Sequence, residues 1–167
     1  MKLQKSTYTN TFESAPEGNV QAVVVDVVDM GMQPDTFNQG ELIHKVRLAF
    51  QTEDETSEGK PFLVSTFPVK ASLNSKANFY KTIKTLIGRD LVDEDYDAEG
   101  DVDLDALLLG VNANVTIKHT EKGDRIYANV VDVSPLTRGQ AKAEPLVSRD
   151  YVRVSDREGF NPEELED

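Results

Sequence analysis

An aspartate-rich stretch, DYDAEGDVDLDA at residues 95–106, has oxygen-bearing side chains at the spacing of a calcium-binding loop. Carboxylates occupy its first, third, fifth, seventh and ninth places, and a glycine occupies the sixth place, where such loops turn sharply. The twelfth place is Ala106, so the bidentate carboxylate that closes the cation shell is missing. We therefore interpret the stretch as a solvated acidic loop and expect neither a bound metal nor a cofactor.

Catalytic side chains are scarce in the rest of the chain. Hydrolysis through a nucleophile needs a base that a third group holds in place. The chain has no cysteine, and its two histidines, His44 and His119, lie near predicted strand edges without a recognisable nucleophile motif. Glycine-rich phosphate-binding sequences of the P-loop or GxGxxG type are also absent. These absences predict a protein that is not an enzyme.

Charge is distributed unevenly along the 167 residues. The net charge is −12, yet residues 53–58, 90–105 and 150–167 hold 20 of the 30 acidic side chains and only two of the 18 basic ones. The remainder carries 16 basic and 10 acidic side chains, a balance of +6. A locally basic body with acidic loops and an acidic tail is compatible with nucleic-acid binding despite the overall acidity.

Binding of a single strand requires cations that follow the phosphates and aromatic faces on which bases stack. Tryptophan is absent, so phenylalanine and tyrosine must provide the stacking faces. The candidate set comprises seven cations and two aromatic residues: Lys45, Arg47, Lys70, Arg89, Lys118, Lys122, Arg125, Phe67 and Tyr127. These residues would surround one groove if the elements that carry them form a small barrel.

The elements that must position this set follow the order strand, strand, strand, helix, strand, strand between residues 20 and 134. The run VQAVVVDVV at residues 20–28 is β-branched almost throughout, which predicts a central or sharply coiled first strand. Residues 30–40 contain glycines and a proline and form the expected connection to the second strand. This order is that of an OB-fold, a five-stranded barrel that binds oligonucleotides or oligosaccharides, in which the first connection flanks the ligand.

The second strand, at residues 44–52, alternates cleanly between two faces. The side chains expected to point into the core are Val46, Leu48 and Phe50. Lys45 and Arg47 share the opposite face, which is expected to point to solvent. Two cations are therefore expected on one outward face of the barrel. A hairpin loop that contains glycine then leads to the third strand.

Residues 72–88 have apolar side chains at helical spacing and predict the helix between the third and fourth strands. Ser72 or Ser75 is the expected N-cap, and Gly88 is the expected end of the helix. A second, short helix capped by Asp103 is expected to cover one end of the barrel.

A closing hairpin is predicted over residues 112–119 and 125–134, because both runs suit strands and the turn TEKGD joins them. The chain then divides into a flexible N-terminal arm at residues 1–18, a mainly β OB-fold domain at 19–136, and an extension with an acidic, disordered tail at 137–167. No apolar run approaches the length of a membrane span, and no secretory signal is recognisable. We therefore expect a cytoplasmic protein without a membrane partner.

Three pieces of the chain carry a resemblance to a known family: GNVQAVVVDVVDMGMQ, ASLNSKANFYKTIKTLIGRDL and VNANVTIKHTEKGDRIYANVVDVSPL. Over roughly residues 18–136 the chain resembles the OB-fold single-stranded-DNA-binding proteins of bacteriophages and prophages, in apolar spacing and turn residues. The resemblance implies non-catalytic binding of single strands during phage DNA replication or recombination in the bacterial host cell. The positions that it implies on the barrel face are Lys45, Arg47, Lys118, Arg125 and Tyr127.

The terminal sequence EELED is similar to the acidic tips with which single-strand-binding proteins recruit replication partners, although it lacks their closing Pro-Phe. The expected partners are therefore single-stranded DNA and, through the tail, replication or recombination proteins. The alternative is an acidic protein-interaction module whose barrel engages a replication or host protein and mimics nucleic-acid charge. The potential in the groove separates the two, because DNA binding requires a positive groove and mimicry a negative one. Exposed strand edges are also compatible with a homodimer.

Overall fold

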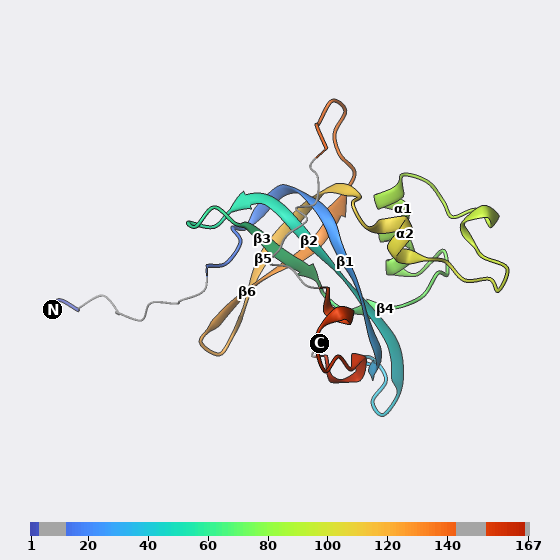
Figure 1. The fold of residues 1–167 in the computed structure, drawn as a ribbon. Coiled ribbons are helices and arrows are strands. Elements are labelled where there is room, and N and C mark those ends of the chain that lie inside the picture. Colours follow the sequence, from blue (N-terminus) through green and yellow to red (C-terminus); the bar gives the residue numbers. More distant parts are fainter. Residues whose placement is uncertain (4–12, 143–152, 166–167) are drawn as a thin grey trace.

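The computed structural model describes residues 1–3, 13–142 and 153–165 of the 167-residue chain. Five strands close into a barrel: β1 (Gly18–Pro34), β2 (Leu42–Glu55), β3 (Pro61–Thr66), β5 (Asn112–Lys122) and β6 (Arg125–Ser134). The ring runs β1, β2, β3, β6, β5 and back to β1, with β3 and β6 parallel and the other neighbours antiparallel. With the helix α1 (Asn78–Ile87) between β3 and β5, this mixed barrel confirms the predicted mainly β OB-fold (Figure 1).

Short elements complete the fold. The two-residue strand β4 (Val69–Lys70) pairs with β2 outside the barrel ring. The helix α2 (Leu104–Leu108) precedes β5, and the side chain of Asp103 caps it as predicted by accepting a hydrogen bond from the Ala106 amide. The described residues also contain three short 3₁₀ turns: η1 (Asp93–Asp95), η2 (Val154–Asp156) and η3 (Pro162–Glu164).

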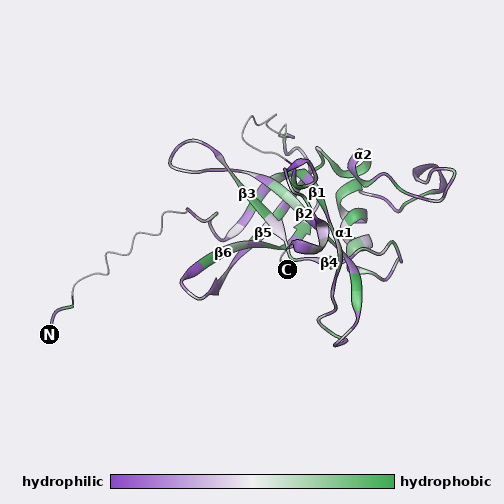
Figure 2. Ribbon diagram, turned by 60° about the horizontal axis from the view of Figure 1, so that its bottom comes forward, coloured by the Kyte–Doolittle hydropathy of each residue, from purple (hydrophilic) through white to green (hydrophobic). Residues whose placement is uncertain are grey.

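The core fills the barrel with alternate side chains of the strands, and Val24 and Phe50 are fully buried there. Both helices add to the same cluster, α1 through Ile83 and its buried neighbours, and α2 through Leu108. Figure 2 shows hydrophobic residues concentrated in the strands and helices and hydrophilic residues at the hairpin tips. The barrel therefore provides a rigid frame whose outer face and tips are available for binding.

The strand β1 is longer than predicted and includes residues 30–34 of the connection expected at residues 30–40. It continues because Gln33 pairs with Ile43 and Pro34 pairs with Leu42 at the start of β2. Irregular pairing at two places lets this 17-residue strand coil, and Gly31 at the second place adopts a φ of 61°, which glycine tolerates well. The connection shrinks to residues 35–41, at the tip of a two-stranded ribbon that projects from the barrel (Figure 1).

The helix α1 begins at Asn78, and the predicted N-caps Ser72 and Ser75 are wrong. The hydroxyl of Ser72 accepts a hydrogen bond from the Asn74 amide, and the side chain of Asn74 accepts one from the amide two residues further on. These side chains stabilise local turns before the helix rather than its first turn. Gly88 ends the helix as predicted, in the left-handed conformation with a φ of 75°.

Residues 153–165 dock on β1, so the prediction of a disordered tail is wrong for this part of the extension. Val154 is 4% exposed and packs with Val28 and Met30 of β1. The prediction failed because a few apolar residues are scattered among many charged ones, which masks a docking segment in a compositional argument. The predicted arm at residues 4–12 and the extension at 143–152 lie outside the described residues.

Candidate nucleic-acid interface

One face of the β5–β6 hairpin carries four of the residues predicted to bind nucleic acid. They are Lys118, Lys122, Arg125 and Tyr127. Lys122 pairs directly with Arg125, and Thr120 pairs with Tyr127; directly opposed residues of an antiparallel pair project to the same side of the sheet. The neighbouring Ile117 points the other way and is buried in the core. The strand alternation thus places these cations and the ring of Tyr127 on the outer face.

A hollow of about 310 Å³ lies between this hairpin and the strands β2 and β3. It brings together Arg47 of β2, Phe67 from the β3–β4 connection, and Lys122 and Tyr127 of the hairpin. The other lining residues are small or polar: Ser65, Thr66, Pro68, Thr120 and Asn129. Four predicted residues that are far apart in the sequence therefore meet at one place.

Arg47 has an unusual environment within this hollow. The side chain is half-buried, and its Nε atom is buried without a hydrogen-bond partner among the described residues. A buried donor without an acceptor costs roughly 1–3 kcal/mol, and more when the group is charged. A ligand in the hollow would reach the terminal nitrogens of Arg47 rather than its covered Nε, and a phosphate oxygen suits the directed N–H groups of a guanidinium.

The two rings in this hollow remain accessible. Phe67 is 48% exposed and Tyr127 is 43% exposed, although both are large enough to be buried in a core. Each ring therefore has free surface next to the cations Arg47 and Lys122. This combination of rings and cations matches what a single strand needs from its binding surface.

A larger hollow of about 670 Å³ continues from Phe67 and Lys122 toward the tip of the β1–β2 ribbon. It adds three lysines to the lining: Lys45, Lys70 and Lys76. It also contains Phe37, which is 93% exposed at the tip. Lys76 and Phe37 are absent from the predicted set. The signal for Phe37 was its place in the connection expected to flank the ligand, where an aromatic side chain has no core to join.

A third hollow of about 340 Å³ shares Tyr127 with the first and adds Arg125. We call the three adjoining hollows the trough. Within the described residues, the lining of the trough holds six cations and two carboxylates, Glu13 and Asp35. The cations are Lys45, Arg47, Lys70, Lys76, Lys122 and Arg125.

The two carboxylates of the trough are already hydrogen-bonded within the protein. Asp35 accepts bonds from the Phe37 amide at 2.9 Å and from the Asn38 side chain at 3.0 Å, and these bonds lower its pKa. Glu13 accepts bonds from the hydroxyl and the amide of Ser57, which lower its pKa. Both groups stay charged but point at local donors, so the lining has more positive than negative groups.

Lys45 lines the trough but is only 4% exposed, so the prediction that it faces solvent is wrong. Ala49, two pairs further along the same face of β2, is also buried, with 6% of its surface exposed. The strand alternation correctly separated this face from the core but could not show how much of the face is buried in the folded protein. Residues 153–165 lie along the neighbouring strand β1.

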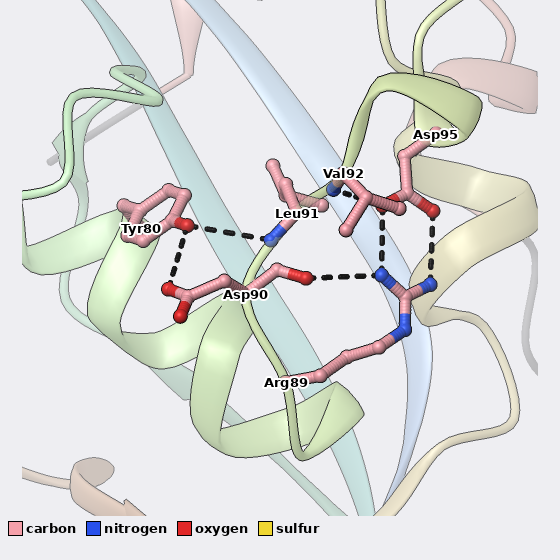
Figure 3. A network of polar contacts seen from close by, with 6 residues as sticks. All are labelled: Tyr80, Arg89, Asp90, Leu91, Val92 and Asp95. Atoms are coloured by element: carbon pink, nitrogen blue, oxygen red, sulfur yellow. Dashed lines mark hydrogen bonds and ion pairs between the residues drawn. The ribbon is translucent and has the colours of Figure 1, made fainter.

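Arg89 does not join the trough. It lies in the segment 89–105, which we call the acidic lobe, and both of its terminal nitrogens bind Asp95, at 2.7 and 2.9 Å (Figure 3). One of them also donates to the Asp90 carbonyl at 3.0 Å. The hydrogen bonds from Arg89 lower the pKa of Asp95 to about 2. Lys118 shares the hairpin face but lines none of the three hollows.

The acidic lobe is organised by its own side chains. The Tyr80 hydroxyl donates to Asp90 at 2.9 Å and accepts from the Leu91 amide, while the Val92 amide donates to Asp95 (Figure 3). The bond to Asp90 raises the pKa of Tyr80, and the same bond lowers the pKa of Asp90. The polar groups of the lobe therefore bond to one another and to Tyr80 of α1.

Comparison of the sequence with protein-family models finds no match, and comparison with curated protein sequences finds none either.

In the loop with calcium-like spacing, carboxylates accept hydrogen bonds from other groups of the protein. Asp95 binds Arg89, and one oxygen of Asp97 accepts from the amides of Glu99 and Asp101. Within the described residues, no three histidine, aspartate or glutamate side chains are placed to hold a metal ion.

The two histidines have partners within the protein. The Nε2 atom of His44 lies 2.6 Å from a carboxylate oxygen of Asp29, and that of His119 lies 2.6 Å from the Ala15 carbonyl oxygen. Both contacts tie neighbouring segments together. No helix in the described ranges is long and apolar enough to cross a membrane.

Proposed function

We propose that the protein binds single-stranded DNA through the trough without sequence preference. One observation carries the proposal: Arg47 and Lys122 line the same hollow as the accessible rings of Phe67 and Tyr127. The Nε atom of Arg47 has no hydrogen-bond partner among the described residues. Cations along the trough would neutralise phosphates, and each stack of a base on a ring contributes about 1–3 kcal/mol.

A single strand suits the lining better than a duplex does. Rings within a concave surface can stack only on bases that are unpaired and turned outward. Lysines, rings and hydroxyl groups dominate the lining, and such groups bind phosphates and base faces of any sequence. These features support binding of single strands without sequence preference.

The cellular role follows from the resemblance of residues 18–136 to single-stranded-DNA-binding proteins of bacteriophages and prophages. We assign the protein to phage-type DNA replication or recombination in the bacterial cytoplasm, where it would protect single strands without catalysis. The acidic C-terminal residues would provide contacts to replication or recombination proteins.

The alternative, a protein-interaction module that mimics nucleic-acid charge, requires a negative groove. Six cations against two carboxylates in the lining of the described trough favour DNA instead. The carboxylates of the acidic lobe belong to a different part of the surface.

The test is a fluorescence anisotropy titration with labelled oligodeoxythymidine at several salt concentrations. We expect tight binding at low salt that weakens as salt rises. The slope of log K against log salt should be no steeper than about −4, since six cations at about 0.7 per phosphate give that limit. Absence of binding at low salt, or equal binding to a duplex of the same length, would overturn the proposal.

A further inference from the structure

The docked residues 153–165, which we call the C-terminal strap, contact β1 through an apolar cluster. Val154 packs against Val28 and Met30, which are 2% and 0% exposed, and Phe160 and Leu165 border the same cluster. Figure 1 shows the strap beside the lower part of the β1–β2 ribbon. The strap is therefore held by burial of apolar surface, which has no counterpart in a purely electrostatic tail.

Polar contacts fix both ends of the C-terminal strap. Asp26 of β1, only 1% exposed, accepts bonds from Arg153 Nε at 3.0 Å and from the Val154 amide at 2.9 Å. The other two nitrogens of Arg153 bind Asp105 of α2 at 3.0 and 2.9 Å. At the far end, Gln33 donates to the carbonyls of Pro162 and Leu165. A charge as deeply buried as Asp26 requires such partners.

Val154 of the strap packs on the face of the β1–β2 ribbon that carries Arg47. Val28, which Val154 covers, is directly opposite Arg47, and Asp26 is directly opposite Ala49. Opposed residues of an antiparallel pair project to one side, with their Cβ atoms about 5 Å apart. Arg47 thus extends from β2 next to a residue that the strap buries.

The burial of neighbouring residues agrees with this placement. Lys45 and Ala49 are nearly buried although they belong to the outer face of β2. Gln33, which holds the strap, is directly opposite Ile43, another residue that lines the trough. The strap therefore lies along β1 from Asp26 to Gln33, opposite the part of β2 that lines the trough.

We propose that the C-terminal strap supports β1 where β1 is paired with Arg47 and so positions Arg47 for DNA, so that it supports binding of single-stranded DNA rather than competing with it. The inference builds on the proposed function of the trough. Without the strap, Val28 would be exposed beside Arg47, and the Arg47 side chain would have to be ordered when DNA binds. Ordering one flexible side chain weakens binding roughly two- to tenfold.

The test compares two variants for which a supporting strap and a competing strap predict different changes in DNA affinity. In the release variant, Val154→Ser with Phe160→Ser, the apolar contacts are lost and the net charge is unchanged. In the charge variant, Asp156→Asn with Glu158→Gln and Glu164→Gln, three exposed acidic residues are neutralised while the docking contacts stay. Circular dichroism melting establishes that both barrels fold. If the release variant unfolds, the single substitution Phe160→Ser replaces it, because this substitution leaves the Asp26–Arg153 contact in place.

We expect the release variant to bind oligodeoxythymidine roughly two- to tenfold more weakly with an unchanged salt slope, because Arg47 keeps its charge and its phosphate contact. The charge variant should bind within about twofold of the unmodified protein at moderate salt, where surface charges are screened. Tighter binding by the release variant would overturn the proposal, because it would make the strap a competitor.

A measurement without DNA separates this inference from the proposed function. In NMR spectra of protein with ¹⁵N-labelled arginine, the Nε–H proton of Arg47 should exchange with solvent faster in the release variant than in the unmodified protein. Unchanged exchange would contradict the positioning role even if DNA binds. Loss of all DNA binding in the unmodified protein would instead contradict the proposed function and leave the exchange result to decide the role of the strap.

Discussion

The trough and the acidic lobe each contain an arginine that the sequence marks as a DNA ligand, and their surroundings differ. Arg47 lines a hollow together with two accessible rings and a lysine, and its buried Nε has no partner in the described residues. Arg89 is bound by both oxygens of Asp95 and by a backbone carbonyl. The comparison shows that the terminal donors of Arg89 are used within the protein, whereas the Nε of Arg47 has no partner among the described residues.

The same contrast holds for the carboxylates of the two regions. The acidic lobe concentrates them and uses several to order its own backbone, as Asp97 does with the amides of Glu99 and Asp101. The trough contains Glu13 and Asp35 among six cations, and each is turned to a local donor. Separate placement of the two charges lets a protein of net charge −12 present a positive groove.

The substitution Arg47→Met should have the largest effect, because it keeps the apolar stem but removes the guanidinium from the trough. Hydrogen bonds to charged groups contribute about 1.5–3 kcal/mol, so affinity for oligodeoxythymidine should fall roughly ten- to hundredfold in anisotropy titrations. The matched control Arg89→Met removes the same charge from the lobe and should change affinity less than about twofold. Equal losses in the two variants would show that only net charge matters.

Loss of a ring should have the next largest effect. Replacing Tyr127 with leucine keeps an apolar side chain but removes a stacking face, and affinity should fall roughly tenfold. Val92→Ala, at an apolar residue of the lobe that is 47% exposed, is the control and should bind normally.

A fluorescent ring gives a direct readout of stacking. The chain has no tryptophan, so Phe67→Trp introduces a single indole whose emission should be quenched when DNA stacks on it. Val92→Trp should not respond. Quenching of the Val92→Trp variant alone would indicate that DNA binds at the lobe and not at the trough.

Neutralising one trough lysine should have a smaller effect. Lys122→Gln should weaken binding a few-fold and make the salt slope shallower by about 0.7, because one phosphate contact is lost. Lys84→Gln is the control, since Lys84 lies on α1, 3.4 Å from Asp90, and lines none of the three hollows. A slope change that is the same in both variants would contradict a localised phosphate path.

Acid should loosen the lobe within a defined pH range. Bonds from Arg89 hold the pKa of Asp95 at about 2, below its ordinary value of 3.8. A lowered pKa contributes stability that is complete above the ordinary value and is lost as the pH falls through about 2. Carboxyl ¹³C shifts of Asp95 should therefore titrate near pH 2, and Arg89→Met should return the midpoint toward 3.8. A midpoint already near 3.8 in the unmodified protein would contradict the pairing.

Strand periodicity in the sequence predicted much of the fold. The element order predicted the barrel, and alternation in β2 and β5 separated core residues such as Leu48 and Val115 from the outer face. The start of α1 was missed because Ser72 and Asn74 stabilise turns that resemble a helix cap in sequence. Local patterns of this kind do not distinguish a cap from an isolated turn.

The site was predictable where it depended on strand faces and less so where it depended on long-range contacts. Arg47, Lys122 and Tyr127 follow from alternation within strands of a barrel. The pairing of Arg89 with Asp95 depends on how the acidic segment folds back, and the docking of Val154 on Val28 joins residues more than a hundred positions apart. Neither contact leaves a periodic signal in the sequence.

The most direct test of the trough is photo-crosslinking of oligodeoxynucleotides that contain 5-iododeoxyuridine, which react with aromatic side chains stacked on the base. Mass spectrometry of the adducts should locate crosslinks at Phe67 and Tyr127 and none at Tyr80 or Tyr96, the tyrosines in or beside the acidic lobe. Adducts at Tyr80 or Tyr96 with Phe67 and Tyr127 unmodified would contradict the account.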